Sequence, residues 1–170
     1  MKKKIDPFEY ASHICKALKP HGVLLTTAAE GKVNTMTIGW GTLGVDWSRP
    51  VFIAYVRESR YTHEMLEKNG EFTVNIPYGD TDNNILGYCG TRSGRDTDKI
   101  ADLGLHLLES DAVSVPGIRE FPLTLECRVI YKEEQDLSRI PAEILERYYP
   151  DGDHHHVYYG QIVGAYLIDE

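Results

Sequence analysis

The chain has little cysteine and no cysteine pair. Its three cysteines, Cys15, Cys89 and Cys127, lie far apart and show no CxxC spacing. This distribution argues against a disulfide framework and against a thiolate zinc site. Cys89 beside Gly90 could be a redox thiol, but without a neighbouring cysteine we expect a small buried residue.

Long apolar runs are missing, and so is an excess of positive charge. No stretch reaches the ~20 apolar residues that a membrane-spanning helix needs, and no apolar segment follows the lysines after Met1. We therefore predict no signal peptide, no membrane contact and a location in the reducing cytoplasm. The formal net charge of −8 argues against a broad basic face for nucleic acid.

What remains is an ordinary globular composition of 170 residues, which predicts one domain over residues 1–170. Helical spacing and end signals predict helices at 6–19, 64–70 and 141–149 and helical pieces within 83–105. Six strands are expected, two within 21–40 around a turn at 30–32 and four at 50–56, 71–77, 122–135 and 157–168. In the last strand, Gly160 and Gly164 could mark bulges or close backbone contacts.

The order of these elements limits the fold class. Strands do not alternate regularly with helices, which makes a parallel doubly wound sheet a poor fit. A small closed antiparallel barrel with peripheral helices fits better, because closure removes exposed strand edges.

The stretch "GWGTLG", residues 39–44, matches the G-x-G-x-x-G pattern of dinucleotide-binding folds. In those folds a helix begins at the glycines, but here "VDWSRP" follows, with a proline and no helical period. We reject that interpretation. The glycines either let a flat ligand or a strand approach closely or simply form a turn.

The stretch "VRESRYTH", residues 56–63, predicts an anion site. A helix beginning near Ser59 to Thr62 would point free backbone N–H groups outward, and hydroxyls and the guanidinium groups of Arg57 and Arg60 would add donors. The competing interpretation is helix capping by Ser59 or Thr62 beside two solvated arginines.

Five segments together resemble a known family: "NTMTIGWG" (34–41), "SRPVFIAYVRESRYTHEML" (48–66), "EFTVNIP" (71–77), "CGTRSGRDTDKIADLGL" (89–105) and "DHHHVYYGQIV" (153–163). Their number, order and spacing resemble the flavin reductase-like, FMN-binding split-barrel proteins, most closely the flavoredoxin branch. The resemblance covers residues 22–167. It implies a mainly β fold with peripheral helices, a six-stranded antiparallel split barrel, and a homodimer that holds FMN near its interface.

The resemblance also implies which residues bind the cofactor. Residues 34–40 would line the ribityl chain and the ring, 57–62 the phosphate end, and 93–99 a loop over the cofactor. The expected cofactor-binding residues are Asn34, Thr35, Met36, Thr37, Ile38, Gly39, Trp40, Arg57, Ser59, Arg60, Tyr61, Thr62, Ser93, Gly94 and Lys99. His155, five residues before Gly160, matches the family's histidine and is the expected catalytic residue, although the match could shift to His154 or His156.

The same three histidines raise the question of a metal. Adjacent residues of an extended chain point to opposite faces, so only His154 and His156 could share an ion. No carboxylate or thiol cluster accompanies them in the sequence, and we predict no metal. Surface histidines are the remaining alternative.

The resemblance implies an FMN-binding oxidoreductase that moves electrons from NADH or NADPH through bound FMN to a flavin, ferric iron or a protein. Because the flavin ring performs the hydride chemistry, such a protein needs no catalytic acid–base pair in its sequence. A flavoredoxin-type electron carrier without its own NAD(P)H site is the main alternative. A barrel that has lost its flavin is the third.

Overall fold

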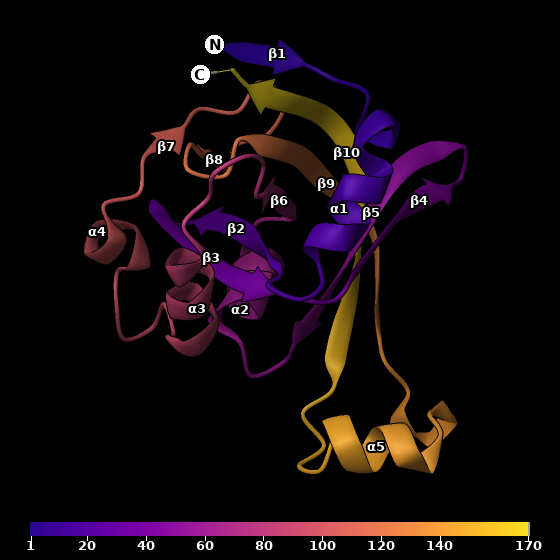
Figure 1. Cartoon of the computed structure of the whole chain (residues 1–170). Coiled ribbons are helices and arrows are strands. Elements are labelled where there is room, and N and C mark those ends of the chain that lie inside the picture. The colour runs from indigo at the N-terminus through magenta and orange to yellow at the C-terminus, as the bar shows by residue number, and fades with distance from the viewer. Residues whose placement is uncertain (170) are drawn as a thin grey trace.

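The computed structural model describes residues 1–169 and is built around one antiparallel sheet (Figure 1). Seven strands follow one another in the order β3-β2-β6-β9-β10-β5-β4, and β1 pairs with β10 as the eighth. The strands are β1 (Lys2–Lys4), β2 (Val23–Ala29), β3 (Lys32–Ile38), β4 (Gly41–Asp46), β5 (Arg49–Arg57), β6 (Glu71–Ile76), β9 (Leu123–Glu134) and β10 (His155–Ile168). Two short strands, β7 (Leu107–Leu108) and β8 (Gly117–Ile118), form a separate pair.

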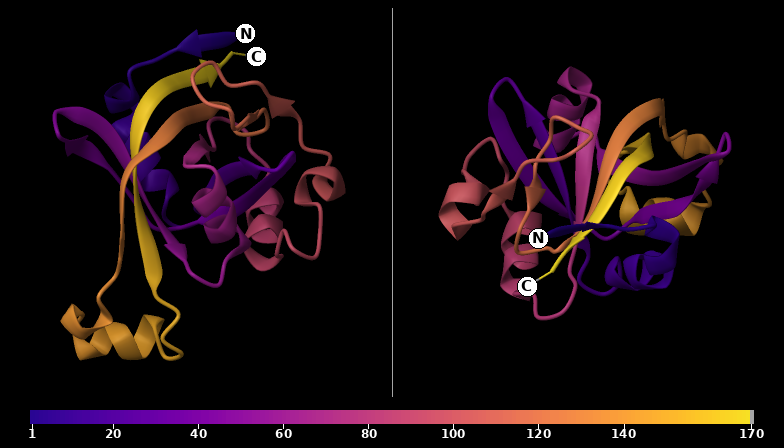
Figure 2. Two further views of the ribbon diagram at one scale, coloured as in Figure 1. Left: turned by 180° about the vertical axis from the view of Figure 1, so that it is seen from behind. Right: turned by 90° about the horizontal axis from the view of Figure 1, so that it is seen from above.

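The helices lie around the sheet. They are η1 (Pro7–Tyr10), α1 (Ala11–Ala17), α2 (Tyr61–Lys68), α3 (Asn83–Thr91), α4 (Lys99–Leu103), η2 (Leu137–Arg139) and α5 (Ala142–Tyr148). Helix α2 packs on β2, whereas α3 and α4 pack on β3. Helix α5 stands apart at the far end of the long β9–β10 hairpin (Figures 1 and 2). Within residues 1–169, no helix is long and apolar enough to cross a bilayer.

The predicted antiparallel sheet with peripheral helices is confirmed, and every predicted strand is present, but the sheet has eight strands instead of the expected six. Closure of the barrel, however, is wrong. Strands β3 and β4 end the sheet, and neither pairs with another strand on its outer side within the described residues. Strand β4 was missed because its glycines obscure the alternation of side chains. Gly41 is required there, since a Cβ at this position would lie 2.6 Å from the Phe52 ring.

The sheet curls around a core of buried side chains, of which Phe52, Phe72 and Tyr158 are among the largest. The register between β9 and β10 shifts at Gly160 and Gly164, which confirms the predicted bulges. A Cβ on Gly160 would lie 2.4 Å from the ring of Phe72. Bulges bend a strand and increase its twist, and this lets β10 follow the curve of the sheet.

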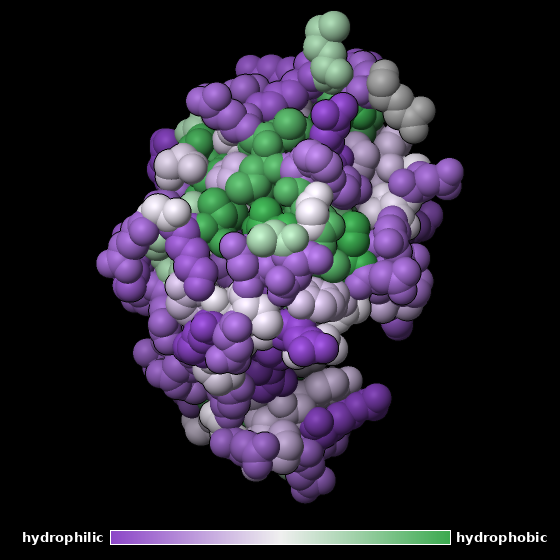
Figure 3. All heavy atoms as spheres, turned by 90° about the vertical axis from the view of Figure 1, so that its left-hand side faces the viewer, coloured by the Kyte–Doolittle hydropathy of each residue, from purple (hydrophilic) through white to green (hydrophobic). Residues whose placement is uncertain are grey.

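Apolar side chains also reach the surface. The face on the side of α4 and β7 carries an apolar area in its upper half, bordered by polar residues (Figure 3). Leu107 of β7 is 40% exposed. Separately, Trp47 in the β4–β5 turn lies about 6 Å, between ring centroids, from Tyr131 and Tyr159 on β9 and β10. Trp47 is 57% exposed, so this aromatic cluster borders on solvent.

Candidate functional site

Two adjoining hollows form one groove between β3 and the corner where β5 leads into α2. Each hollow has a volume of about 150 Å³. Met36, Thr37 and Arg60 line both hollows, which makes the groove continuous. The first hollow is also lined by Ile38, Gly39, Trp40, Tyr55, Arg57 and His155, and the second by Asn34, Ser59, Tyr61, Thr62, Cys89, Gly90, Arg92, Ser93, Gly94, Arg95 and Lys99.

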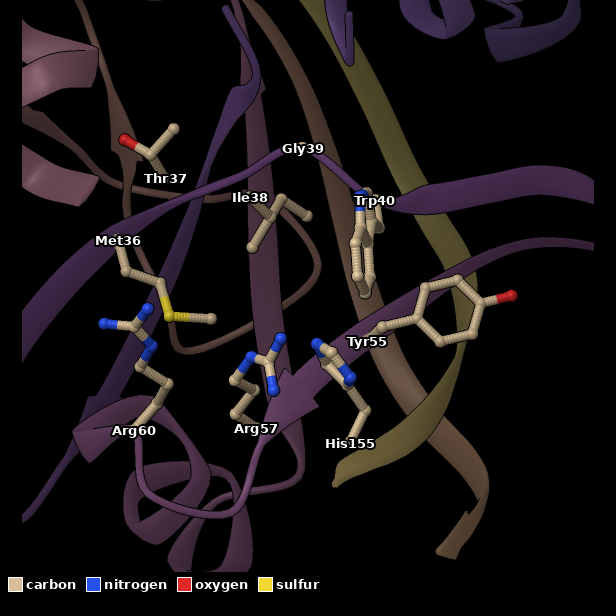
Figure 4. A pocket seen from close by; sticks show the side chains of 9 residues that line it. All are labelled: Met36, Thr37, Ile38, Gly39, Trp40, Tyr55, Arg57, Arg60 and His155. Atoms are coloured by element: carbon tan, nitrogen blue, oxygen red, sulfur yellow. The ribbon is translucent and has the colours of Figure 1, made fainter. Parts of the chain in front are cut away.

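The first hollow is apolar and aromatic on one wall. Met36 and Ile38 project from the same face of β3, and Trp40 follows them (Figure 4). The Trp40 ring lies 5.0 Å from that of His155 and 5.2 Å, edge-on, from that of Tyr148. Such a wall suits one face of a flat ring system.

The edge of β3 supplies polar groups beside this wall. The strand ends the sheet, and its outer backbone groups face α3 and α4. The carbonyl of Thr35 points to that side, since it accepts a hydrogen bond of 2.8 Å from Lys99 Nζ. Alternation along a strand then directs the N–H and C=O of Thr37 to the same edge. These groups lie where a ligand's polar edge could bond to them.

The β5–α2 corner carries the cationic part of the groove. Arg60 is the N-cap residue of α2 in extended conformation, and no side chain caps this helix end. Its own side chain is exposed, points into the groove (Figure 4), and has no hydrogen-bond or ionic partner within residues 1–169. The first N–H groups of α2 lack helical acceptors, and together with the helix dipole they favour an anion.

The side chains of Arg57 and Ser59 at this corner are already engaged. Arg57 donates to the carbonyl oxygens of Asp153 at 2.6 Å and Tyr148 at 2.9 Å, and its guanidinium lies 5.1 Å from the Tyr149 ring centroid. Ser59 donates its hydroxyl to the Asp153 carboxylate at 2.7 Å. Both residues therefore fasten the segment after α5 to the corner, and of the three side chains Arg60 is the one without a partner among the described residues.

The predicted loop closes the second hollow. Gly94 packs tightly, because a Cβ there would lie 2.1 Å from the Asn34 amide oxygen, and its carbonyl accepts a 2.7 Å bond from Lys32 Nζ. Lys99, 4% exposed, donates to the Thr35 and Cys89 carbonyls. Burial lowers the pKa of Lys99.

Cys89 also lines this hollow, but it is only 1% exposed. Burial raises the pKa of its thiol to about 11. A thiol held protonated is a poor nucleophile, and the geometry supports the packing role expected from the sequence.

His155 faces the first hollow with a defined hydrogen-bond role. The Tyr149 hydroxyl donates to Gln135 Oε1 at 2.8 Å and lies 2.7 Å from His155 Nδ1. Because a hydroxyl has one proton, the network assigns the Nδ1 proton to His155 and leaves Nε2 as an acceptor. Burial, with a smaller effect of the Arg57 guanidinium, lowers the pKa of His155 to about 4.

The structure brings the predicted residues together, with one exception. All the expected cofactor-binding residues and His155 line the groove except Thr35, whose side chain is fully buried against Thr26. Sequence reasoning did not assign Tyr55, Cys89, Gly90, Arg92 or Arg95 to the groove. Tyr55 precedes Arg57 by two residues on one strand face, a spacing that could have revealed it.

A comparison with protein families decides the relationship. A model described as "Flavin reductase like domain" matches residues 18–170. The chain belongs to the flavin reductase-like family. An uncharacterized protein of Archaeoglobus fulgidus is 34% identical over 129 residues, or 75% of this chain and 72% of the relative.

Solved structures of other proteins share the fold. The flavoredoxin of Methanosarcina acetivorans is 29% identical, with a TM-score of 0.64 over 86% of this chain and 68% of its own. The NADH:FAD oxidoreductase of Streptomyces globisporus is 17% identical, with a TM-score of 0.66 over 98% of this chain and 87% of its own. The second likeness concerns the fold alone.

Proposed function

We propose that the groove binds FMN and that the chain is an oxidoreductase, taking electrons from NADH or NADPH and passing them to a flavin, ferric iron or a protein. One observation carries the proposal. A single continuous groove has an aromatic, apolar wall in its first hollow and cationic side chains around Arg60, which lines both hollows and has no partner among the described residues. That is the chemistry of a flat ring joined to a terminal phosphate.

The phosphate belongs in the second hollow. Arg60 and the first N–H groups of α2 would bind its oxygens, with the Ser93 hydroxyl on the opposite side. The Asp153 carboxylate repels an anion from the far side of the corner, where it accepts the bonds of Ser59. The phosphate position is therefore displaced from Arg57 and Ser59 toward the loop at Gly94.

The ring belongs in the first hollow. Met36, Ile38 and Trp40 provide the apolar wall, and the Thr37 backbone offers a donor and an acceptor to the ring's polar edge. His155 Nε2 is placed to accept a hydrogen bond from a proton-bearing group of the ring or of a second substrate. When bound, FMN itself accepts a hydride and releases electrons, whereas the protein positions it and controls access.

A homodimer is part of the proposal. The exposed aromatic cluster of Trp47, Tyr131 and Tyr159 offers a contact of the residue types enriched in protein interfaces. A second copy of the chain covering it would remove this apolar area from water.

An electron carrier without its own nicotinamide site is the second candidate. The 29% identity with a flavoredoxin favours it. In this case the groove holds FMN permanently and a partner protein reduces it.

Spectroscopy tests both candidates. The purified chain is saturated with FMN, desalted, and mixed without oxygen with NADH or NADPH while the visible flavin absorption is followed. Rapid bleaching supports the oxidoreductase, and bleaching only with dithionite or a partner protein supports the carrier. A protein that stays colourless after reconstitution refutes both.

A further inference from the structure

A second cluster of polar side chains lies on the opposite side of β10 from the groove. His155 points into the groove, and because side chains alternate along a strand, His154 and His156 point away from it. Their rings are neighbours, with centroids 5.2 Å apart. The fold adds what the sequence neighbourhood lacks, since Glu58 follows β5, the strand paired with β10.

We propose that Glu58, His154 and His156 form a binding site for a divalent transition-metal ion of the zinc type. Each residue offers one ligand atom, and these three atoms lie within 4.8 Å of one another. Two imidazoles and one carboxylate are a ligand set that zinc accepts, with a water in the fourth position.

The burial of two histidine nitrogens is a second observation in favour of this site, separate from the closeness of the three side chains. His156 is only 8% exposed. Its Nε2 atom is buried, as is that of His154, and neither has a hydrogen-bond partner within residues 1–169. Buried polar atoms are almost always satisfied, so two neighbouring unsatisfied nitrogens require an explanation. A metal ion would satisfy His156 Nε2 through its lone pair, and His154 would bind the ion through Nδ1, the ring nitrogen that faces Glu58.

The geometry needs a small adjustment. Metal–ligand distances of ~2.0–2.2 Å place the ligand atoms of a tetrahedral site roughly 3.3–3.6 Å apart. The side chain of Glu58 is 59% exposed and has the freedom to move inward. Its carboxylate is 3.8 Å from His154 Nδ1, and Glu134 lies 3.6 Å from His154 Nε2 on the other side. The acidic surroundings favour a cation.

The ion would tie together parts of the chain that frame the groove. Glu58 belongs to the corner between Arg57 and Arg60, and the two histidines flank His155. Metal binding should therefore stiffen the start of β10. The proposal does not depend on the flavin, because none of the three ligands lines the groove.

Calorimetric titration of the chelator-treated, full-length chain with ZnCl₂ tests the site, both without and with FMN. We expect one Zn²⁺ per chain. Glu58→Gln should weaken binding at least ten-fold, His156→Gln should abolish it, and the control His106→Gln, at an exposed histidine paired with Glu120, should leave it unchanged. With Co²⁺ as probe, the wild type should show the visible absorption of a four-coordinate ion.

Two results would overturn the proposal: no stoichiometric binding by the wild type, or equal affinity in Glu58→Gln. Since Glu58 is exposed, its variant should fold even where His156→Gln does not, and circular dichroism checks this. As an independent readout, Zn²⁺ should raise the melting temperature of the wild type and of His106→Gln, but not that of Glu58→Gln.

Discussion

Replacing Arg60 by alanine should selectively remove the recognition of a phosphate. The side chain points into the groove and has no partner among the described residues, so its donors are free for a ligand. Losing a hydrogen bond to a charged group costs about 1.5–3 kcal/mol. Such a loss corresponds to about a ten- to hundred-fold weaker affinity for FMN.

The neighbouring Arg57→Ala should behave differently. Its guanidinium already donates to the carbonyl oxygens of Asp153 and Tyr148. We expect a smaller effect on FMN and a looser segment around α5, seen as faster amide hydrogen exchange in residues 135–154. Arg119→Ala, at an exposed arginine outside the groove, is the matched control and should change neither property.

Comparing FMN with riboflavin, which lacks the phosphate, makes the assay specific. Fluorescence titrations of the wild type should show a clear preference for FMN. Arg60→Ala should reduce this preference while its riboflavin affinity remains close to that of the wild type. The reasoning is refuted if Arg60→Ala binds FMN as tightly as the wild type, or loses both ligands equally.

Three further changes test other parts of the structure. Gly94→Ala should destabilise the fold by about 1–3 kcal/mol through overpacking, whereas Gly87→Ala, with open space around it, should be neutral or stabilising by about 0.5–1 kcal/mol; equal unfolding midpoints would contradict this. Burial lowers the pKa of Lys99, so the unfolded chain binds more protons than the folded chain at pH values between this lowered pKa and the ordinary value of 10.5. The free energy of unfolding of the wild type, compared with that of Lys99→Met, should therefore increase as the pH rises toward 10.5. Urea unfolding at two pH values measures that gain, and a flat or falling difference would exclude it. Light scattering should give twice the mass of one chain, and the double variant Trp47→Ser, Tyr131→Ser should shift it toward the monomer; a monomeric wild type would end the dimer proposal.

Much of the fold could be predicted because most strands show their pattern locally. The alternation in 71–77 and the apolar run in 50–56 identified β6 and β5 without tertiary information. Strand β4 had no such signal, because two of its six residues are glycines, of which Gly41 leaves room for the ring of Phe52. Whether the sheet closes depends on β3 and β4 meeting across the whole molecule, which no local pattern records.

The candidate site was predictable in its members but not in their bonding. The resemblance placed Arg57, Ser59 and Arg60 at one corner, and the structure has them there. The hydrogen bond from Ser59 to Asp153 could not be predicted from the sequence, because the two residues are 94 positions apart. Glu58 was likewise invisible as a neighbour of His154, since only the pairing of β5 with β10 joins them.

The three consecutive histidines at the start of β10, His154 just before the strand and His155 and His156 within it, place their side chains on alternate sides of the sheet. His155 serves one side of the sheet and its two neighbours serve the other. A slip of the strand by a single position would exchange these assignments without altering the composition of the segment. The spacing of His155 from the bulge at Gly160 thus constrains both sides at once, and neither can change its geometry alone.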